Sequence, residues 1–171
     1  DAFGWSIDAN DDLLIVGAPS DDQRVSATGA AYVFRFDGTH WDEDQKLVAS
    51  NAQKNDAFGV SVSIHGDYVI VGAPGEDGAT GSSGAAYVFQ FGGKKWLEQQ
   101  KLIADNVTGL GDGDYFGWST SLSQIVGGPV AIIGAYQDDE GAPNTGSAYI
   151  FRLDPGTHRW YQEQELIADP P

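Results

Sequence analysis

The stretch DAFGVSVSIHGDYVIVGAP, residues 56–74, decides the fold. Large side chains alternate with Gly and Ser from Phe58 to Ile64, a period of two that is typical of a β-strand with one bulky face and one small face. The run Tyr68-Val69-Ile70-Val71 is apolar throughout, as expected of a strand that is covered on both sides. The turn sequence His65-Gly66-Asp67 joins the two strands, so the stretch predicts a tight β-hairpin.

This hairpin belongs to a unit that occurs three times along the chain. Matching units span residues 1–55, 56–113 and 114–171. Gly-Ala-Pro ends the second strand of the first two units, because proline cannot donate a hydrogen bond within a sheet. A third strand follows (AAYVFRF, AAYVFQF, SAYIFRL), and then a polar strand led by Trp (WDEDQKL, WLEQQKL, WYQEQEL). Each unit therefore predicts four strands.

Four antiparallel strands in a repeated unit of this length indicate an all-β fold built from β-propeller blades. The sequence predicts three four-stranded antiparallel blades. Propellers have about four to eight blades, so we expect these three to form part of a six- or seven-bladed ring. A β-sandwich is the alternative architecture, but it would not need units that resemble one another so closely.

The composition excludes several classes of partner. The formal net charge is −16, which argues against binding to nucleic acid or to an anionic membrane surface. There are no cysteines, so disulfides and thiolate chemistry are excluded, and no apolar run is long enough for membrane insertion. The chain does not begin with Met and shows no signal peptide, so we expect a mature piece or a fragment of a longer protein.

The first two units carry Phe-Gly-x-Ser followed by Val-Gly-Ala-Pro, and unit three keeps Phe116-Gly117 but has Gly134-Ala135-Tyr136. This pattern resembles the FG-GAP repeat of integrin α-subunit propellers and, more closely, of microbial and protist surface proteins. The resemblance covers the whole chain. It implies a non-catalytic extracellular or cell-surface module for adhesion, protein–protein recognition or structural assembly. Its partner would be another protein, or further blades from the same or a second chain.

The resemblance stops short of the integrin calcium site. Integrin-type repeats often carry a DxDxDG calcium loop between the FG and GAP motifs, where this chain has short hairpins at 8–12, 65–67 and 123–129. Calcium takes about six to eight oxygen ligands, which these hairpins do not supply. We expect no integrin-like calcium site there, and no cofactor is required.

A weaker metal candidate is the group of acidic residues that follows each GAP position, on one face of the blades. These residues are Asp21, Asp22, Glu76, Asp77, Asp138 and Asp139. One interpretation is that they bind calcium or another divalent cation. We favour the alternative, which is ordinary polar turn chemistry and solubility.

No catalytic motif is present, and two alternative functions stay open: a carbohydrate-binding propeller and a hydrolase or lyase built on the propeller scaffold. Ser6, Ser61 and Ser119 recur at one position, so packing or a backbone hydrogen bond explains them better than a nucleophile does. Trp5 and Trp118 align with Val60 and are expected in the core. The Trp residues that lead the fourth strands are expected to pack structurally rather than to stack on sugars. Asn106 begins a glycosylation sequon that matters only in a eukaryotic secreted protein.

Overall fold

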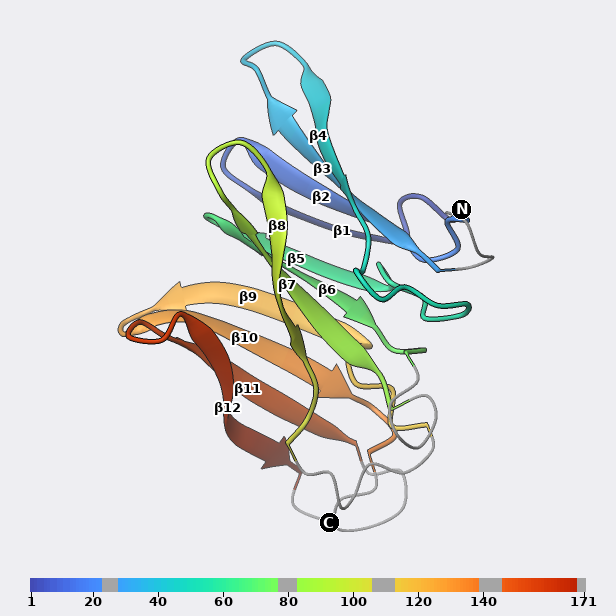
Figure 1. Cartoon of the computed structure of the whole chain (residues 1–171), viewed down its shortest axis with the longest axis vertical. Coiled ribbons are helices and arrows are strands. Elements are labelled where there is room, and N and C mark those ends of the chain that lie inside the picture. Colours follow the sequence, from blue (N-terminus) through green and yellow to red (C-terminus); the bar gives the residue numbers. More distant parts are fainter. Residues whose placement is uncertain (23–27, 77–82, 106–112, 139–145, 169–171) are drawn as a thin grey trace.

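The computed structural model describes residues 1–22, 28–76, 83–105, 113–138 and 146–168. These residues form three four-stranded antiparallel sheets and contain no helix, which confirms the predicted all-β fold. The sheets stack face against face as three blades in an open arc, with blade 1 and blade 3 at opposite ends of the stack (Figure 1). Each sheet takes its strands from one predicted unit, whereas the boundaries between units and the number of blades in a ring stay predictions.

The strands follow the chain in order within every blade. Blade 1 contains β1 (Ser6–Asn10), β2 (Leu13–Ala18), β3 (Ala30–Phe36) and β4 (Trp41–Leu47). Blade 2 contains β5 (Ser61–His65), β6 (Tyr68–Ala73), β7 (Ala85–Phe91) and β8 (Trp96–Leu102). Blade 3 contains β9 (Ser119–Ile125), β10 (Gly128–Ala135), β11 (Ser147–Asp154) and β12 (Arg159–Ile167).

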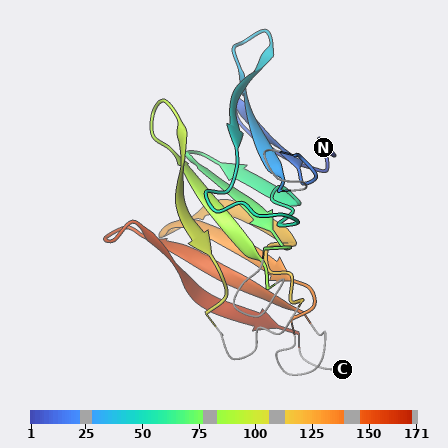
Figure 2. The same ribbon diagram turned by 45° about the vertical axis from the view of Figure 1, so that its right-hand side comes forward.

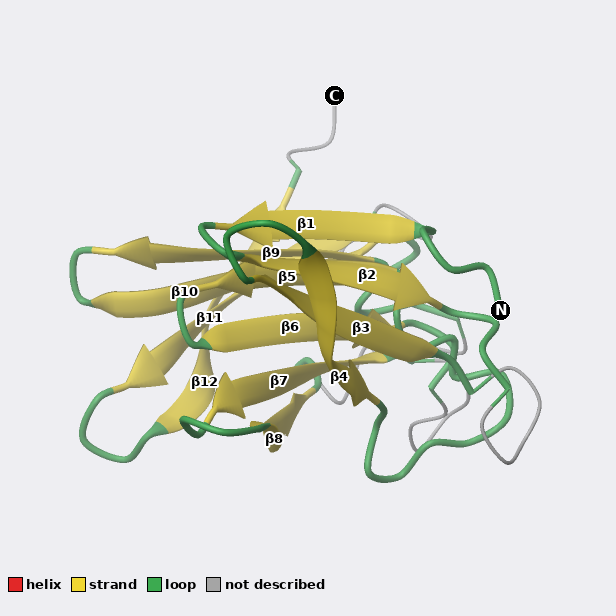
Figure 3. Cartoon of the chain, turned by 90° about the horizontal axis from the view of Figure 1, so that it is seen from above, coloured by secondary structure: helices red, strands yellow, loops and turns green. Residues whose placement is uncertain are grey.

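The first strands β1, β5 and β9 lie side by side along one edge of the stack, and the fourth strands lie toward the other edge (Figure 3). Figure 2 shows the same stack from a second side, with the sheets fanning apart toward the fourth strands. Crowding at the first strands explains their Gly and Ser residues. The core fills the two spaces between blades: one apolar cluster joins blades 1 and 2, and a second joins blades 2 and 3.

The Phe-Gly pair forms the tight turn that opens each blade. In blade 2, the Val60 N–H donates to the Ala57 carbonyl oxygen at 3.1 Å, and Gly59 lies within this turn at a φ of +96°. Glycine is favoured where the third residue of a β-turn needs a positive φ. An added Cβ at Gly59 would also lie 2.3 Å from the Ala30 carbonyl oxygen of blade 1. The turn therefore requires glycine both for its backbone and for its contact with the preceding blade.

The first glycine of Gly-Ala-Pro supplies the surface on which the next Phe-Gly turn rests. An added Cβ at Gly72 would lie only 1.9 Å from the Gly117 carbonyl oxygen of blade 3. Ser61 Oγ donates a hydrogen bond to this same oxygen at 2.8 Å. The junction of blades 1 and 2 repeats the arrangement, with Ser6 Oγ donating to the Gly59 carbonyl oxygen at 2.9 Å. The predicted backbone hydrogen bond is thus confirmed for Ser6 and Ser61, and the FG and GAP motifs of neighbouring blades contact each other.

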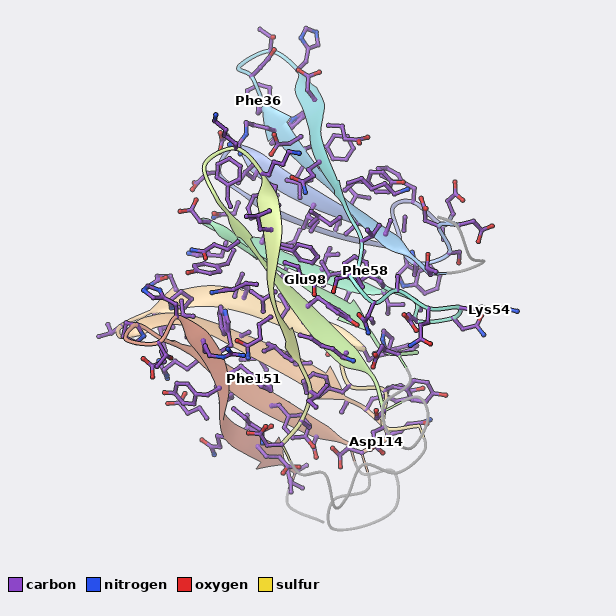
Figure 4. All side chains as sticks on the ribbon, viewed as in Figure 1. Phe36, Lys54, Phe58, Glu98, Asp114 and Phe151 are labelled. Carbon is purple, nitrogen blue, oxygen red and sulfur yellow. The ribbon has the colours of Figure 1, made fainter. Side chains whose placement is uncertain are left out.

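In blades 2 and 3, the phenylalanine of this turn anchors the contact with the preceding blade. Phe58 lies between the sheets of blades 1 and 2 (Figure 4) and is 0% exposed. Its backbone N–H donates to the Thr28 carbonyl oxygen at 3.2 Å, and Phe116 makes the equivalent bond to Ser83 at 3.0 Å. The turn is therefore held both by its side chain and by its backbone.

The expectation that Trp5 and Trp118 are core residues is wrong. Trp5 is 63% exposed, and Trp118 is 45% exposed although blade 2 packs against its blade. The strands begin only after the Phe-Gly turn, at Ser6 and Ser119, so the alternation seen inside a strand cannot be extended back across the turn.

Candidate functional site

The first acidic residue after each GAP position turns inward, against its own blade. Asp21 in blade 1 is buried. It accepts hydrogen bonds from the Tyr32 hydroxyl at 2.6 Å and from Lys46 Nζ at 2.9 Å. Tyr32 and Lys46 face each other in the pairing of β3 with β4. The carboxylate is therefore neutralised by an ammonium group within its own sheet.

Blade 2 has the same network with one insertion. Buried Glu76 forms an ion pair with Lys101 and accepts a hydrogen bond from Asn51 Nδ2 at 3.1 Å. The hydroxyl of Tyr87 donates to Asn51 Oδ1 at 2.8 Å, so the amide stands between the tyrosine and the carboxylate. The carboxylate is thus held by Lys101 on the fourth strand and by Asn51 in the loop between β4 and β5.

These networks raise the pKa of Lys46 and of Tyr87. Burial opposes the charge of Lys46, but its hydrogen bonds to Tyr32 and Asp21 outweigh this effect and raise the pKa of the ammonium. Burial, helped by the nearby negative charge of Glu76, raises the pKa of Tyr87 well above its ordinary value. Both shifts keep these residues protonated to a higher pH than in an unfolded chain.

Blade 3 departs from this pattern. The Tyr149 hydroxyl donates to buried Asp138, as Tyr32 does to Asp21 in blade 1. The residue opposite Tyr149 is Glu165, where blades 1 and 2 have lysine. Glu165 Oε1 is buried and has no hydrogen-bond partner among the described residues. Blade 3 therefore has a second carboxylate where its neighbours have an ammonium.

The predicted metal ligands are thus not gathered into one described cluster. Asp21, Glu76 and Asp138 lie in three separate blades, and Asp22 is exposed. The described residues contain no group of three or more His, Cys, Asp or Glu side chains placed to hold a metal ion. Asp77, Asp139 and Asn106 lie outside the described residues. Calcium binding at the acidic loops stays a prediction.

Sequence reasoning missed the partners of these carboxylates, although a signal was present. Tyr32, Tyr87 and Tyr149 recur in register, and Lys46 and Lys101 recur on the next strand. A tyrosine and a lysine that repeat at facing positions, together with a repeated acid, indicate a buried ion pair.

The first hairpin, between β1 and β2, also contacts the hairpin of blade 2. Asp8 Oδ2 accepts hydrogen bonds from Ser63 Oγ at 2.7 Å and from the Ile64 N–H at 2.9 Å. Asn10 Oδ1 accepts one from the Gly66 N–H at 2.9 Å. The nearest counterpart of an integrin calcium loop therefore joins blade 1 to blade 2.

A glutamine on the fourth strand of blades 1 and 2 holds the backbone of the next blade. Gln100 Oε1 accepts from the Trp160 N–H at 3.0 Å, and its Nε2 donates to the Trp160 carbonyl oxygen at 2.8 Å. Gln45 holds Trp96 in the same way, with both hydrogen bonds at 2.9 Å. Trp96 and Trp160 are buried, which confirms their structural packing.

A β-bulge directs a second polar side chain at Trp96 and at Trp160. The pairing of strands three and four shifts register at one equivalent point in all three blades. Asp44 at the bulge of blade 1 accepts a hydrogen bond from Trp96 Nε1 at 3.2 Å, and Gln99 of blade 2 accepts one from Trp160 Nε1 at 3.2 Å. Bulges commonly re-aim a side chain in this way.

The structure leaves aromatic residues exposed on blade 3. Trp118 lies with its ring centroid 4.8 Å from that of Tyr136, and Tyr115 stacks on Tyr136 at 5.5 Å. Tyr136 occupies the place of the GAP proline, so the departure from the motif creates this cluster. Trp118 and Tyr136 are exposed and Tyr115 is half-buried, so the cluster provides a surface for stacking.

Three comparisons bear on identity. Residues 1–34, 41–89 and 96–151 match the model of a family described as FG-GAP repeat. No curated protein matches the chain.

In the described part of the chain, no helix has the length and apolar character needed to cross a membrane.

Among solved structures, the chain is similar in fold to the Saccharomyces cerevisiae protein Sqt1, with a TM-score of 0.58 and 12% sequence identity. The match covers 97% of this chain but 36% of that structure, so the chain spans about a third of its length. At this identity the likeness supports the fold alone. The family match covers most of the sequence, and it agrees with the contact between FG and GAP motifs at both blade junctions. The chain belongs to the FG-GAP repeat family.

Proposed function

We propose that the chain is a non-catalytic FG-GAP propeller module that acts outside the cell or on its surface, in adhesion, protein recognition or structural assembly. The observation that carries this proposal is the pair of open blade faces at the two ends of the stack. Phe3 is 56% exposed on blade 1, and Ile132 and Leu166 are exposed on blade 3. Exposed apolar surface of this kind marks a contact, made either with another protein or with further blades.

The use of polar side chains in the junctions supports a binding role over an enzymatic one. Ser61 and Gln100 serve the contact between blades 2 and 3, and Asp21 and Glu76 are paired with lysines in their own sheets. A catalytic group needs to be free to meet a substrate, and these repeated groups are committed to structure. The function then depends on surfaces rather than on a reactive centre.

Antibodies against the recombinant chain, applied to cells of the source organism, test this proposal. We expect labelling of intact cells or of the medium, followed by cross-linking of the labelled protein to another polypeptide. Labelling that requires permeabilised cells would contradict a surface or secreted role.

A second candidate is carbohydrate binding, favoured by the cluster of Tyr115, Trp118 and Tyr136. Exposed aromatic faces stack on the apolar faces of sugar rings. A glycan array probed with the chain and with Trp118→Ala tests it. The matched control is Trp5→Ala, which removes the exposed tryptophan at the same position of blade 1. Equal glycan binding by both variants and the parent chain would exclude the cluster as a sugar site.

A further inference from the structure

The buried acid networks of blades 1 and 2 each end in an ammonium group. In blade 1, Lys46 Nζ lies 2.9 Å from Asp21 Oδ1 and 3.0 Å from Asp21 Oδ2. The same nitrogen lies 5.0 Å from the centroid of the Tyr32 ring. In blade 2, Lys101 forms the corresponding ion pair with Glu76. Each of these sheets therefore places one positive charge against its buried carboxylate.

Blade 3 differs from this construction at two positions. Glu165 stands on the fourth strand at the position that is lysine in blades 1 and 2. Ser147 stands at the start of the third strand, where blade 1 has Ala30 and blade 2 has Ala85. Both differences add oxygen atoms to the surroundings of the buried Asp138 carboxylate.

The added oxygens lie on one face of the sheet, together with the Asp138 network. Ser147 and Tyr149 are two residues apart on β11 and are both buried, so their side chains share the face that packs against blade 2. Glu165 is directly opposite Tyr149 on β12 and shares that face. The Tyr149 hydroxyl donates to Asp138, and the Gly146 N–H donates to the Asp138 carbonyl oxygen at 3.0 Å. Two carboxylates and two hydroxyls therefore border one region of this face.

Two of these oxygen atoms lack a hydrogen-bond partner among the described residues. They are Ser147 Oγ, in a residue that is 9% exposed, and the buried Glu165 Oε1. Buried polar atoms in folded proteins nearly always have a partner. The Lys and Arg residues of unit three are Arg152, which is paired with a glutamate of β12, and Arg159, which is exposed at the start of that strand. The two carboxylates thus need a cation that unit three does not supply.

We propose that blade 3 binds a calcium ion between the carboxylates of Asp138 and Glu165, with the Ser147 hydroxyl as a further ligand. Calcium takes carboxylate and other oxygen ligands in flexible geometry and completes its shell with water, and two carboxylates balance its charge. A glutamate side chain is shorter than lysine, so it leaves room for an ion where blade 1 has an ammonium nitrogen. Magnesium fits less well, because it demands a near-ideal octahedron.

This site is separate from the calcium loops of integrin-type repeats. Those loops correspond to the hairpin between β9 and β10, whereas Asp138 follows the far end of β10. The inference also goes beyond the proposed function and does not depend on it. A chain that fails to bind calcium can still act as a surface module, and a chain that binds calcium can act elsewhere.

The small number of carboxylates sets the expected affinity. Calcium sites of extracellular modules have dissociation constants of about 10⁻⁴–10⁻³ M, and we expect a value in this range. Such a site releases its ion in buffer without added calcium, so EDTA alone leaves Tm as it is. At about 10 mM added calcium, binding to the folded state favours folding by roughly 10- to 100-fold. The signature is therefore a rise in Tm on addition of calcium.

Isothermal titration calorimetry and thermal unfolding of the chain, with calcium chloride up to about 10 mM, test the proposal. We expect saturable binding to a single class of site and a higher Tm. Glu165→Lys supplies the ammonium of blades 1 and 2, so it should fold normally and lose calcium binding. Ser147→Ala restores the residue of the other blades and should weaken binding by about tenfold. Glu43→Lys is the matched control, because it makes the same charge change at an exposed position and should bind like the parent.

Three results would overturn the proposal. The first is a parent chain without saturable calcium binding in this range. The second is a Glu165→Lys variant that binds calcium like the parent, which would place any ion elsewhere. The third is an equal rise in Tm with magnesium chloride that Glu43→Lys and Glu165→Lys reduce alike, since this would show only general screening of the negative charge.

Discussion

Replacing Gly72 by alanine tests the contact between the FG and GAP motifs most directly. The added Cβ would lie 1.9 Å from the Gly117 carbonyl oxygen, whereas ordinary contacts begin near 3.4 Å. Because backbone lies on both sides, blades 2 and 3 must separate locally. Overpacking of this kind costs about 1–3 kcal/mol. Loss of the hydrogen bond from Ser61 Oγ to Gly117 adds about 1 kcal/mol.

We therefore expect Gly72→Ala to lower the free energy of unfolding by about 2–4 kcal/mol. For a chain of this size, that corresponds to a fall in Tm of about 4–16 °C. Urea unfolding followed by tryptophan fluorescence measures the change. Gly92→Ala in the same blade is the control and should change stability by no more than about 0.5 kcal/mol. If Gly72→Ala proves insoluble, Ser61→Ala tests the same junction and should cost about 1 kcal/mol. Equal unfolding midpoints for Gly72→Ala and Gly92→Ala would refute the tight contact.

Three other outcomes are expected. Glu165→Lys places an ammonium beside the Asp138 network and should stabilise the chain by about 1 kcal/mol, measured by thermal unfolding. Glu43→Lys, at an exposed strand position, changes the net charge equally and should not stabilise the chain. Equal stabilisation by both variants would show a general response to charge and contradict the prediction. Stability should be full below pH 10 and fall as the pH rises above it, because the folded chain keeps the Tyr87 proton that the unfolded chain loses. A smaller alkaline loss in Tyr87→Phe checks this assignment, and an unchanged pH profile would contradict it. EDTA should leave Tm unchanged, since the buried acids of blades 1 and 2 are neutralised by lysines. A fall in Tm that added calcium reverses would instead place a metal at the acidic loops.

The sequence predicted the strands well because their signals are local. Alternation over residues 58–64 and the apolar run at 68–71 each lie within one strand, and turn residues separate them. The repeated Ser61 was correctly linked to a backbone hydrogen bond, because a nucleophile has no reason to recur in every unit. Threefold repetition allowed each prediction to be checked twice more within the same chain.

The errors and omissions had two causes: a turn that redirects the chain, and contacts between distant segments. Trp118 was expected in the core because the alternation was extended across a turn whose glycine redirects the chain. The inward orientation of Asp21 depends on Lys46, which is 25 residues away and becomes a neighbour only when β3 pairs with β4. Glu165, which breaks the pattern of lysines, has meaning only once that pairing is known.

The contact of each Phe-Gly turn with the preceding blade has a consequence for cooperativity. Strong coupling links successive blades, while blades 1 and 3 lack any direct contact within the described residues that would couple them as strongly. Such a chain behaves as a nearest-neighbour array, in which every added unit contributes its own stability and one interface. In the 171-residue chain, amide hydrogens of β6 and β7 should then exchange most slowly, because among the three described blades it is blade 2 that has a neighbour on each side. Duplication of a unit adds a Phe-Gly turn together with the GAP glycine that the next turn contacts, so this architecture can gain or lose blades without redesign of any junction.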